Sequence, residues 1–303
     1  MITIQPYMLA ALGAVLFSAT SFLITKHVLK NVLEDVFVFI FYFNLFAGLA
    51  GMLLWLKVSF SFPSPATMGI IFVVCLLAFI GLIFNYLAFH KGDISSTGPL
   101  MGLKIPFVAI VSYLLLGERH GGLVYLGVFL SMVSVALLSW EHRKGVKAKP
   151  AIGIPVLFMT MATMLYALSD TLSRVVLREI DSWNFSSYFL VVNALFSLSL
   201  YPFIRNRPEM KLTLRTGVYL LGIAFLALGL TVFFYLSVKM GDNITVPNIL
   251  LSSRGVLVVL ATFVLSHLAK NPVLESQNRR TYAIRFVGAV LMSVAVALVI
   301  KKP

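Results

Sequence analysis

Apolar residues fill most of the chain in long runs that short polar connections separate. An α-helix needs about 20 apolar residues to cross the hydrocarbon core of a bilayer, and the runs have about this length. Ten runs can be placed, over residues 7–25, 37–56, 68–89, 96–116, 123–140, 152–173, 185–204, 218–238, 245–267 and 282–300. The pattern therefore predicts an all-α membrane protein with ten transmembrane helices.

One connection differs from the others because it is long and basic. Residues 141–150 read EHRKGVKAKP, and they divide the predicted spans into two sets of five. Since five is an odd number, the second set must enter the membrane with the opposite orientation. We expect a first five-helix repeat at residues 1–140, a basic linker at residues 141–151 and an inverted five-helix repeat at residues 152–303.

Each half carries a cation inside a predicted span, beside a residue that weakens a helix. Lys104 precedes Pro106, whose missing backbone N–H leaves the carbonyl of Gly102 unbonded and kinks the helix. In the second half Arg254 precedes Gly255, and alignment of the halves brings Lys104 within one position of Arg254. Irregular backbone persists in a bilayer only where protein or a watery cavity surrounds it, so the matched interruptions predict a transporter's binding site.

Polar and aromatic residues within the spans extend this candidate site. In the same alignment Asn44 matches Asn193, and Tyr86 matches Tyr235. Amides both donate and accept hydrogen bonds, which suits a ligand with mixed polar groups, although the same side chains could equally join helices. The predicted substrate-binding residues are Asn44, Asn85, Tyr86, Lys104, Asp170, Asn193, Tyr235, Asn248 and Arg254.

Asp170 is the acid that lies well within a span, and two interpretations of it remain open. Arg174 follows four residues later on the same helix face, so the two could form a structural ion pair. Alternatively, Asp170 belongs to the binding site, where it could exchange a proton with the substrate. The in-span cations Lys104 and Arg254, which have no acid nearby in the sequence, favour a substrate with a carboxylate or phosphate.

The composition is that of a membrane protein, and it indicates which binding partners to expect. Hydrophobic residues make up 60% of the chain, charged residues 12%, and the mean hydropathy is +0.97, which excludes a soluble domain. The net charge of +13 falls in short connections between apolar spans, so we expect contact with membrane lipid and no nucleic-acid partner. A single cysteine, Cys75, excludes an internal disulfide.

Motifs of bond-making chemistry are absent from the sequence. It contains no HExxH, no GxSxG and no phosphate-binding loop, and its five histidines lie scattered at span ends without metal-ligand spacing. We therefore expect no enzyme activity, no cofactor and no metal site.

Three segments match a known pattern. Leu116-Gly117-Glu118 closes the fourth predicted span, an apolar run follows at residues 127–138, and residues 14–26 read AVLFSATSFLITK. Together these resemble the EamA-type branch of the drug/metabolite transporter superfamily. The resemblance implies two inverted five-helix repeats around a substrate cavity, which spans one to four and six to nine line while spans five and ten lie outside it. It also implies that both termini are cytoplasmic.

The distribution of cations points to the other orientation. More lysine and arginine lies in connections on the side away from the N-terminus, and the positive-inside rule would then place both termini outside. Most of that bias comes from three connections, whereas the resemblance covers the whole chain. We expect cytoplasmic termini.

These features predict a secondary active transporter in a bacterial or archaeal cytoplasmic (inner) membrane. It would move a small polar metabolite, such as an amino acid or other organic anion, by alternating access, with metabolite export as the expected direction and protons as a candidate coupling ion. A flippase for a lipid or lipid-linked headgroup is the alternative, because it would use the same cations on phosphate. A channel, which would need no alternating state, is the third class.

Overall fold

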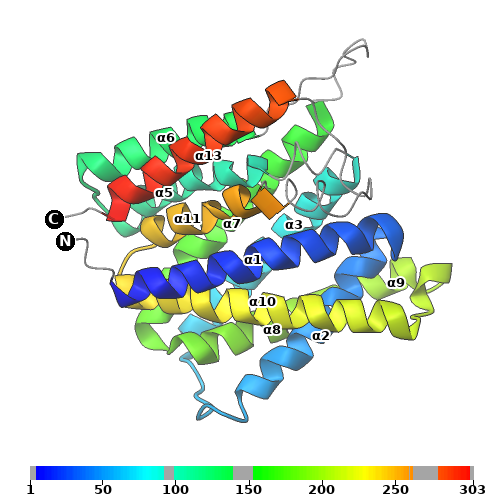
Figure 1. The fold of residues 1–303 in the computed structure, drawn as a ribbon. Coiled ribbons are helices and arrows are strands. Elements are labelled where there is room, and N and C mark those ends of the chain that lie inside the picture. Colours follow the sequence, from blue (N-terminus) through cyan, green and yellow to red (C-terminus); the bar gives the residue numbers. More distant parts are fainter. Residues whose placement is uncertain (1–4, 92–98, 139–152, 259, 262–278, 301–303) are drawn as a thin grey trace.

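The computed structural model describes residues 5–91, 99–138, 153–258, 260–261 and 279–300 of the chain, and its regular elements in these ranges are helices (Figure 1). The predicted linker at residues 141–151 lies outside the described residues. The α-helices are α1 (Pro6–Asn31), α2 (Val36–Leu54), α3 (Pro65–Lys91), α5 (Lys104–Leu116), α6 (Gly122–Leu138), α7 (Gly153–Glu179), α8 (Ser182–Ser197), α9 (Tyr201–Ile204), α10 (Leu214–Gly241), α11 (Thr245–Ser252) and α13 (Arg279–Ile300). Three short 3₁₀ helices are η1 (Pro99–Leu103), η2 (Leu198–Leu200) and η3 (Pro208–Met210).

Six helical segments in the described residues are long and apolar enough to cross a membrane: Pro6–Asn31, Val36–Leu54, Pro65–Lys91, Gly153–Glu179, Ser182–Ile204 and Leu214–Gly241. Shorter apolar helices cover Leu100–Leu116, Gly122–Leu137 and Ala283–Leu298. The prediction of an all-helical membrane protein is confirmed. In the ninth predicted span, α11 forms the first part, and residues 262–267 lie outside the described residues.

Aspartates begin α2 and α8, the second helix of each half. The carboxylate of Asp35 accepts hydrogen bonds from the backbone N–H groups of Phe37 and Val38, at 2.9 and 3.0 Å. Asp181 accepts the same two bonds at the start of α8, both at 2.9 Å. Such caps satisfy N–H groups that have no partner within the helix, so the two aspartates stabilise the starts of these helices.

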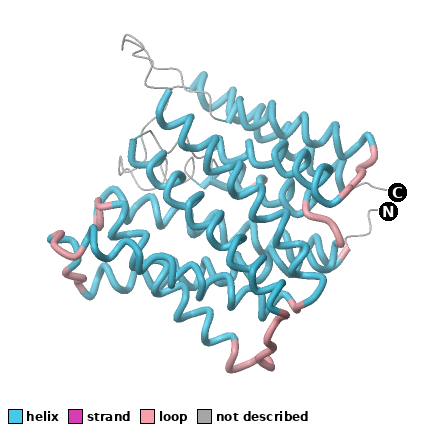
Figure 2. Tube along the Cα trace, turned by 180° about the vertical axis from the view of Figure 1, so that it is seen from behind, coloured by secondary structure: helices cyan, strands magenta, loops and turns pink. Residues whose placement is uncertain are grey.

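The helices pack in four main pairs: α1 with α10, α3 with α7, α2 with α8, and α6 with α13. The pair α6 and α13 forms one edge of the molecule, and α1 begins on the same side on which α13 ends (Figure 1). Seen from behind, the described loops lie at the ends of helices rather than between them (Figure 2). The bundle therefore presents helix faces, rather than loops, along most of its length.

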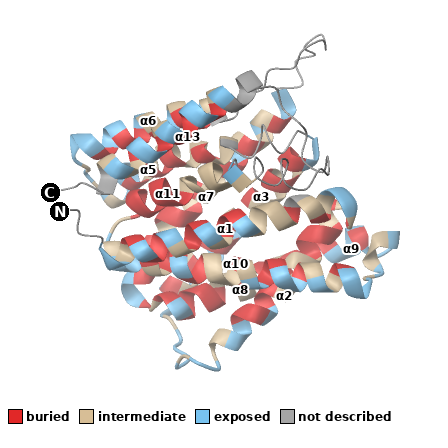
Figure 3. Ribbon diagram, viewed as in Figure 1, coloured by how far each residue is buried: buried red, intermediate tan, exposed pale blue. Residues whose placement is uncertain are grey.

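Burial divides the long helices into an inner and an outer face, whereas the short helix α11 is buried along almost its whole length (Figure 3). Many large apolar side chains lie on the outside, for example Leu16, Phe129 and Phe225, which are all more than half exposed. A soluble protein rarely exposes so much apolar surface, whereas lipid tails cover it at no cost. The outer surface is thus the one that a bilayer requires.

Glycines bring α2 and α8 into close contact. A methyl group at Gly48 would lie 2.5 Å from the Cβ atom of Ala194, and one at Gly51 would lie 2.9 Å from the Cβ atom of Leu190. Small residues of this kind allow helices in a membrane to approach closely and gain dispersion energy. The contact fixes how the two helices cross beside the cavity described next.

Candidate functional site: a charged cavity between the helices

A cavity of about 240 Å³ lies between the helices of the two halves. Its polar and charged lining residues are Ser18, Ser21, Thr25, Asn44, Asn85, Tyr86, Lys104, Tyr166, Asp170, Asn193, Thr231, Tyr235 and Arg254. Its apolar lining residues are Phe22, Phe43, Ala47, Ala78, Leu82, Phe89, Met101, Phe189, Leu190, Ala227, Leu230, Phe234 and Leu251. In the described part of the chain, none of them belongs to α6 or α13. This matches the arrangement that the family resemblance implies.

The cavity brings together eight of the nine residues that the sequence analysis selected. Asn44, Asn85, Tyr86, Lys104, Asp170, Asn193, Tyr235 and Arg254 all line it. The exception is Asn248, which is fully buried on α11 and donates a hydrogen bond to the carbonyl of Ile244 at 3.0 Å. Their common location is a fact of the structure, and their role in binding stays a prediction.

Lys104 and Asp170 form an ion pair across the cavity wall. The Nζ atom of Lys104 on α5 donates to the Oδ2 atom of Asp170 on α7, at 2.7 Å. The same Nζ atom lies 5.4 Å from the centre of the Phe234 ring, which gives the ammonium a second, weaker contact. The sequence offered Lys104 no nearby acid and offered Asp170 the partner Arg174. The structure corrects both expectations, because the pair joins residues 66 positions apart.

Among the described residues, Arg254 forms hydrogen bonds only to neutral groups. Its Nη1 atom donates to the hydroxyl of Ser18 on α1 at 2.8 Å, and its Nη2 atom lies 3.1 Å from the Sδ atom of Met101. A thioether sulfur is a weak acceptor compared with a carboxylate oxygen. The guanidinium therefore keeps most of its capacity to bind an anion.

Both cations lie where the backbone is interrupted. The 3₁₀ helix η1 changes to the α-helix α5 at Lys104, two residues before Pro106. In the second half α11 ends at Ser252, a turn follows at Ser253, and Arg254 comes next. The proline cannot supply the N–H that an α-helix would use, which accounts for the tighter winding before it. In the second half the helix is interrupted at Ser253, whereas the sequence predicted the interruption at Gly255.

Asn44 and Asn193 occupy matching positions with matching bonds. The amide nitrogen of Asn44 donates to the carbonyl of Ile40 at 2.9 Å, and that of Asn193 donates to the carbonyl of Phe189 at 2.7 Å. Each bond stays within its own helix, four residues back. No hydrogen bond to either amide oxygen is found among the described residues, so both oxygens remain available to a ligand.

Several residues that line the cavity were not predicted from the sequence. Tyr166 lies one turn before Asp170 on α7, and this spacing of four residues could have revealed it. Ser18 and Met101, the partners of Arg254, carry no such signal. Serine and methionine are ordinary residues of membrane helices, and only the packing of α1 and η1 against Arg254 singles them out.

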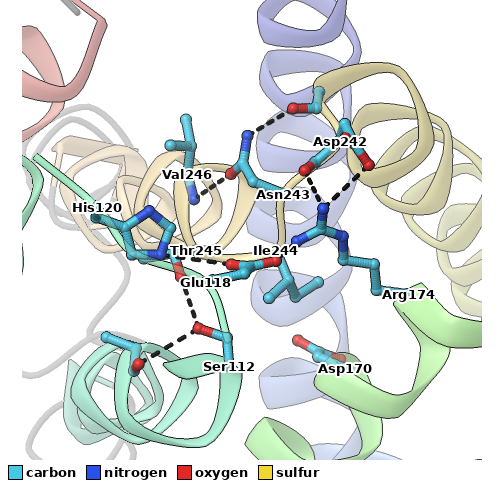
Figure 4. A network of polar contacts seen from close by, with 12 residues as sticks. Ser112, Glu118, His120, Asp170, Arg174, Asp242, Asn243, Ile244, Thr245 and Val246 are labelled. Carbon is cyan, nitrogen blue, oxygen red and sulfur yellow. Dashed lines mark hydrogen bonds and ion pairs between the residues drawn. The ribbon is translucent and has the colours of Figure 1, made fainter. Parts of the chain in front are cut away.

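Arg174 belongs to a second polar cluster, beyond the cavity along α7. Its guanidinium forms ion pairs with Glu118, which follows α5, and with Asp242 Oδ1, which follows α10, the latter at 3.0 Å (Figure 4). Gly117 ends α5 in the left-handed conformation, with φ of 64°, and so turns the chain that leads to Glu118. His120 adds its Nε2 atom 3.4 Å from Glu118 Oε2. We call Glu118, Arg174 and Asp242 the ion cluster.

Comparison with protein families agrees with this architecture. Residues 5–140 match the model of the EamA-like transporter family. This first part of the chain is therefore similar to EamA-like transporters of the drug/metabolite transporter superfamily. Together with the long apolar helices, the match supports a multi-pass integral membrane protein.

Comparison with solved structures supports the fold of the whole chain. One crystal structure aligns with a TM-score of 0.74 at 14% sequence identity, over 98% of this chain and 99% of the other. At this identity the likeness concerns the fold alone. No curated protein matches the sequence.

Proposed function

We propose that this EamA-type protein is a secondary active transporter of a small polar metabolite in the cytoplasmic membrane, working by alternating access. The observation that carries the proposal is the cavity, whose walls come from both halves and which holds Lys104, Asp170 and Arg254. Charged groups within a membrane protein are costly, and they are kept where they bind a substrate or an ion. An amino acid or another organic anion fits a site with more cations than acids, and export is the direction that we propose.

The second half of the chain is part of this proposal as an inverted repeat of the first, which makes ten spans in all. In an inverted repeat, α1 corresponds to α7 and α3 corresponds to α10. Exchange of the two halves then converts the helix pair α1–α10 into the pair α7–α3. Both pairs are among the four main packing pairs of the structure. The pairs α2–α8 and α6–α13 map onto themselves. This symmetry of packing supports a pseudo-two-fold axis through the cavity, which is the geometry that lets two halves rock around a fixed site.

The ion cluster supports a conformation that is closed on one side. Arg174 lies one turn beyond Asp170, toward the end of α7, and its side chain is 9% exposed. It joins the ends of α5, α7 and α10 through Glu118 and Asp242. We propose that this cluster seals the cavity toward the side on which α1 begins, and that it separates when the cavity opens there.

Protons are the coupling ion that we propose, with Asp170 as the acceptor. Asp170 is the one carboxylate among the described lining residues, and it faces Lys104, Arg254, Tyr166 and Tyr235. Protonation would release Lys104 and so change the charge that the site offers to a substrate. An imposed pH gradient should then drive uptake, and uptake should lose this dependence in Asp170→Asn.

The test of transport is counterflow in liposomes that contain the purified protein. Liposomes loaded with an unlabelled amino acid or short carboxylate should accumulate the labelled solute above its outside concentration, and the initial rate should saturate. Uptake that rises linearly and ignores the internal solute would indicate a channel and contradict the proposal. Movement of a labelled phospholipid between leaflets, without movement of soluble metabolites, would favour the flippase instead.

A further inference from the structure

The charges that line the cavity do not balance. Lys104 and Asp170 neutralise each other at 2.7 Å, with side chains 12% and 11% exposed. Among the described residues, the hydroxyl of Ser18 and the sulfur of Met101 are the hydrogen-bond partners of Arg254. The other described lining residues are neutral, since they are apolar, hydroxyl, amide or phenol side chains. The described lining residues therefore carry one net positive charge, and Arg254 is the cation that lies outside the Lys104–Asp170 pair.

A single uncompensated charge sets the valence of the best ligand. Withdrawal of an unpaired ion from water costs free energy. A ligand of opposite charge offsets that cost best when its negative charges equal the unpaired positive charges of the site in number. A neutral ligand would leave the arginine uncompensated, and a dianion would bring a second negative charge that no free cation meets. Lys104 cannot supply that cation without leaving Asp170 unpaired.

We propose that the cavity selects a monovalent organic anion with an apolar body, bound through one carboxylate to Arg254. This rests on the proposed transport function and narrows its substrate class. The carboxylate takes the place of Met101 Sδ on the guanidinium, because a charged oxygen is a much stronger acceptor than a thioether. A planar guanidinium also matches a carboxylate with two parallel hydrogen bonds.

The remaining wall suits the apolar body of such an anion. Phe22, Phe43, Phe89, Phe189 and Phe234 line the cavity from five helices, and aliphatic residues fill the space between them. Burial of apolar ligand surface against such a wall is favourable, and small-molecule sites commonly combine an apolar lining with a few placed polar groups. Asn44 and Asn193, with available amide oxygens, would accept from a donor on the ligand.

Three probes that share a six-carbon chain and differ in charge test the proposal. Hexanoate carries one negative charge, adipate carries two, and hexanamide is neutral. We would measure their dissociation constants for the purified full-length protein by isothermal titration calorimetry at pH 7.5. Hexanoate should bind at least about tenfold more tightly than adipate or hexanamide. Each of these leaves one charge unpaired in a buried site, which weakens the binding free energy. Equal or tighter binding of adipate, or no binding of hexanoate, would overturn the proposal.

Variants that change the charge of the cavity give a sharper test. Asp170→Asn raises the charge by one and should shift the preference toward adipate, whereas Lys104→Met lowers it by one and should abolish the preference for anions. The double variant Lys104→Met with Asp170→Asn restores a single positive charge, so the preference for hexanoate should return. An unchanged ranking in all three folded proteins would exclude control by valence.

The outcome is distinguishable from failure of the transport proposal. Counterflow of a dicarboxylate would leave the transporter function intact and remove only the inference about valence. Monodispersity in size-exclusion chromatography and a cooperative melting transition identify the variants that are folded. A variant that fails these criteria is replaced by Asp170→Ser or Lys104→Gln, which make the same change in charge with smaller or more polar side chains.

Discussion

The Nζ atom of Lys104 lies 2.7 Å from the Oδ2 atom of Asp170 and thereby joins α5 to α7 inside the cavity. In the sequence, Lys104 has no nearby acid, and Asp170 has Arg174 as a possible partner. The ion pair changes what a substitution of Lys104 should do, because removal of one partner leaves a buried charge without compensation.

Lys104→Met should therefore lower stability as well as binding. Loss of one partner of a buried pair costs about 3–5 kcal/mol, whereas replacement of both partners by neutral groups costs much less. In detergent, Lys104→Met should melt well below the parent, and Lys104→Met with Asp170→Asn should recover most of the loss. Additive losses in the double variant would show that the two charges do not interact.

Arg254→Met should abolish binding of the anionic substrate with a smaller effect on the melting temperature. Its hydrogen-bond partners among the described residues are neutral, and Asp170 keeps Lys104 as its ion-pair partner when Arg254 is removed. Arg254→Lys keeps the charge but loses the planar pair of donors, and it should bind at an intermediate affinity. If Arg254→Met binds like the parent, the anion site lies elsewhere.

Asn44→Ala and Asn193→Ala should each raise the KM of transport while the protein still folds. Both side chains line the cavity, and a polar bond within a membrane bundle contributes only about 0.6 kcal/mol on average to stability. Asn248→Ala is the matched control, because this buried asparagine does not line the cavity. It should leave KM unchanged. If KM rose in Asn248→Ala and stayed unchanged in the other two variants, Asn248 and not Asn44 or Asn193 would contact the substrate.

Arg174→Gln should open the cavity toward the side on which α1 begins, because it removes both ion pairs of the ion cluster. A cysteine placed at Ser21, in the cavity lining, would report this as faster labelling by a membrane-impermeant maleimide. Cys75 is fully buried and should not react. Arg178→Gln, at an exposed position on the same helix, is the control and should leave the labelling rate as in the parent.

The termini should lie in the cytoplasm. A C-terminal fusion to alkaline phosphatase, which is active only in the periplasm, should be inactive, and a fusion to green fluorescent protein should fluoresce. The reverse pattern would show that the excess of lysine and arginine on the opposite side determines the orientation.

The sequence predicted the location of the site better than its internal partnerships. Lys104, Asp170 and Arg254 were selectable because a charge within an apolar span is costly and therefore rarely incidental. Asn44 and Asn193 were selectable because they match when the two halves of the sequence are aligned. These signals are local or periodic, so they survive in the sequence. Nothing in the spacing of Lys104 and Asp170 revealed that they form a pair, because the contact depends on how α5 packs against α7.

For Arg174 the sequence suggested an ion pair that the structure does not contain among its described residues. A spacing of four residues on one helix makes an ion pair with Asp170 geometrically possible, and the sequence contains no information that excludes it. In the structure the arginine turns to Glu118 and Asp242, which are 56 and 68 residues away in the sequence. Several acids compete for each cation in a folded bundle, and the closest in sequence has no advantage once the helices have packed.

The contact between α2 and α8 has an electrical consequence. Gly48 and Gly51 bring the two helices so close that a methyl group at Gly48 would overlap Ala194. Neither a file of water molecules nor a lipid tail has room between the helices at that level, so protons and ions cannot leak past the cavity along this seam. A carrier that draws on an ion gradient dissipates it through any such leak. In the proton-coupled carrier proposed above, the absence of a side chain at these two positions would therefore prevent such a leak.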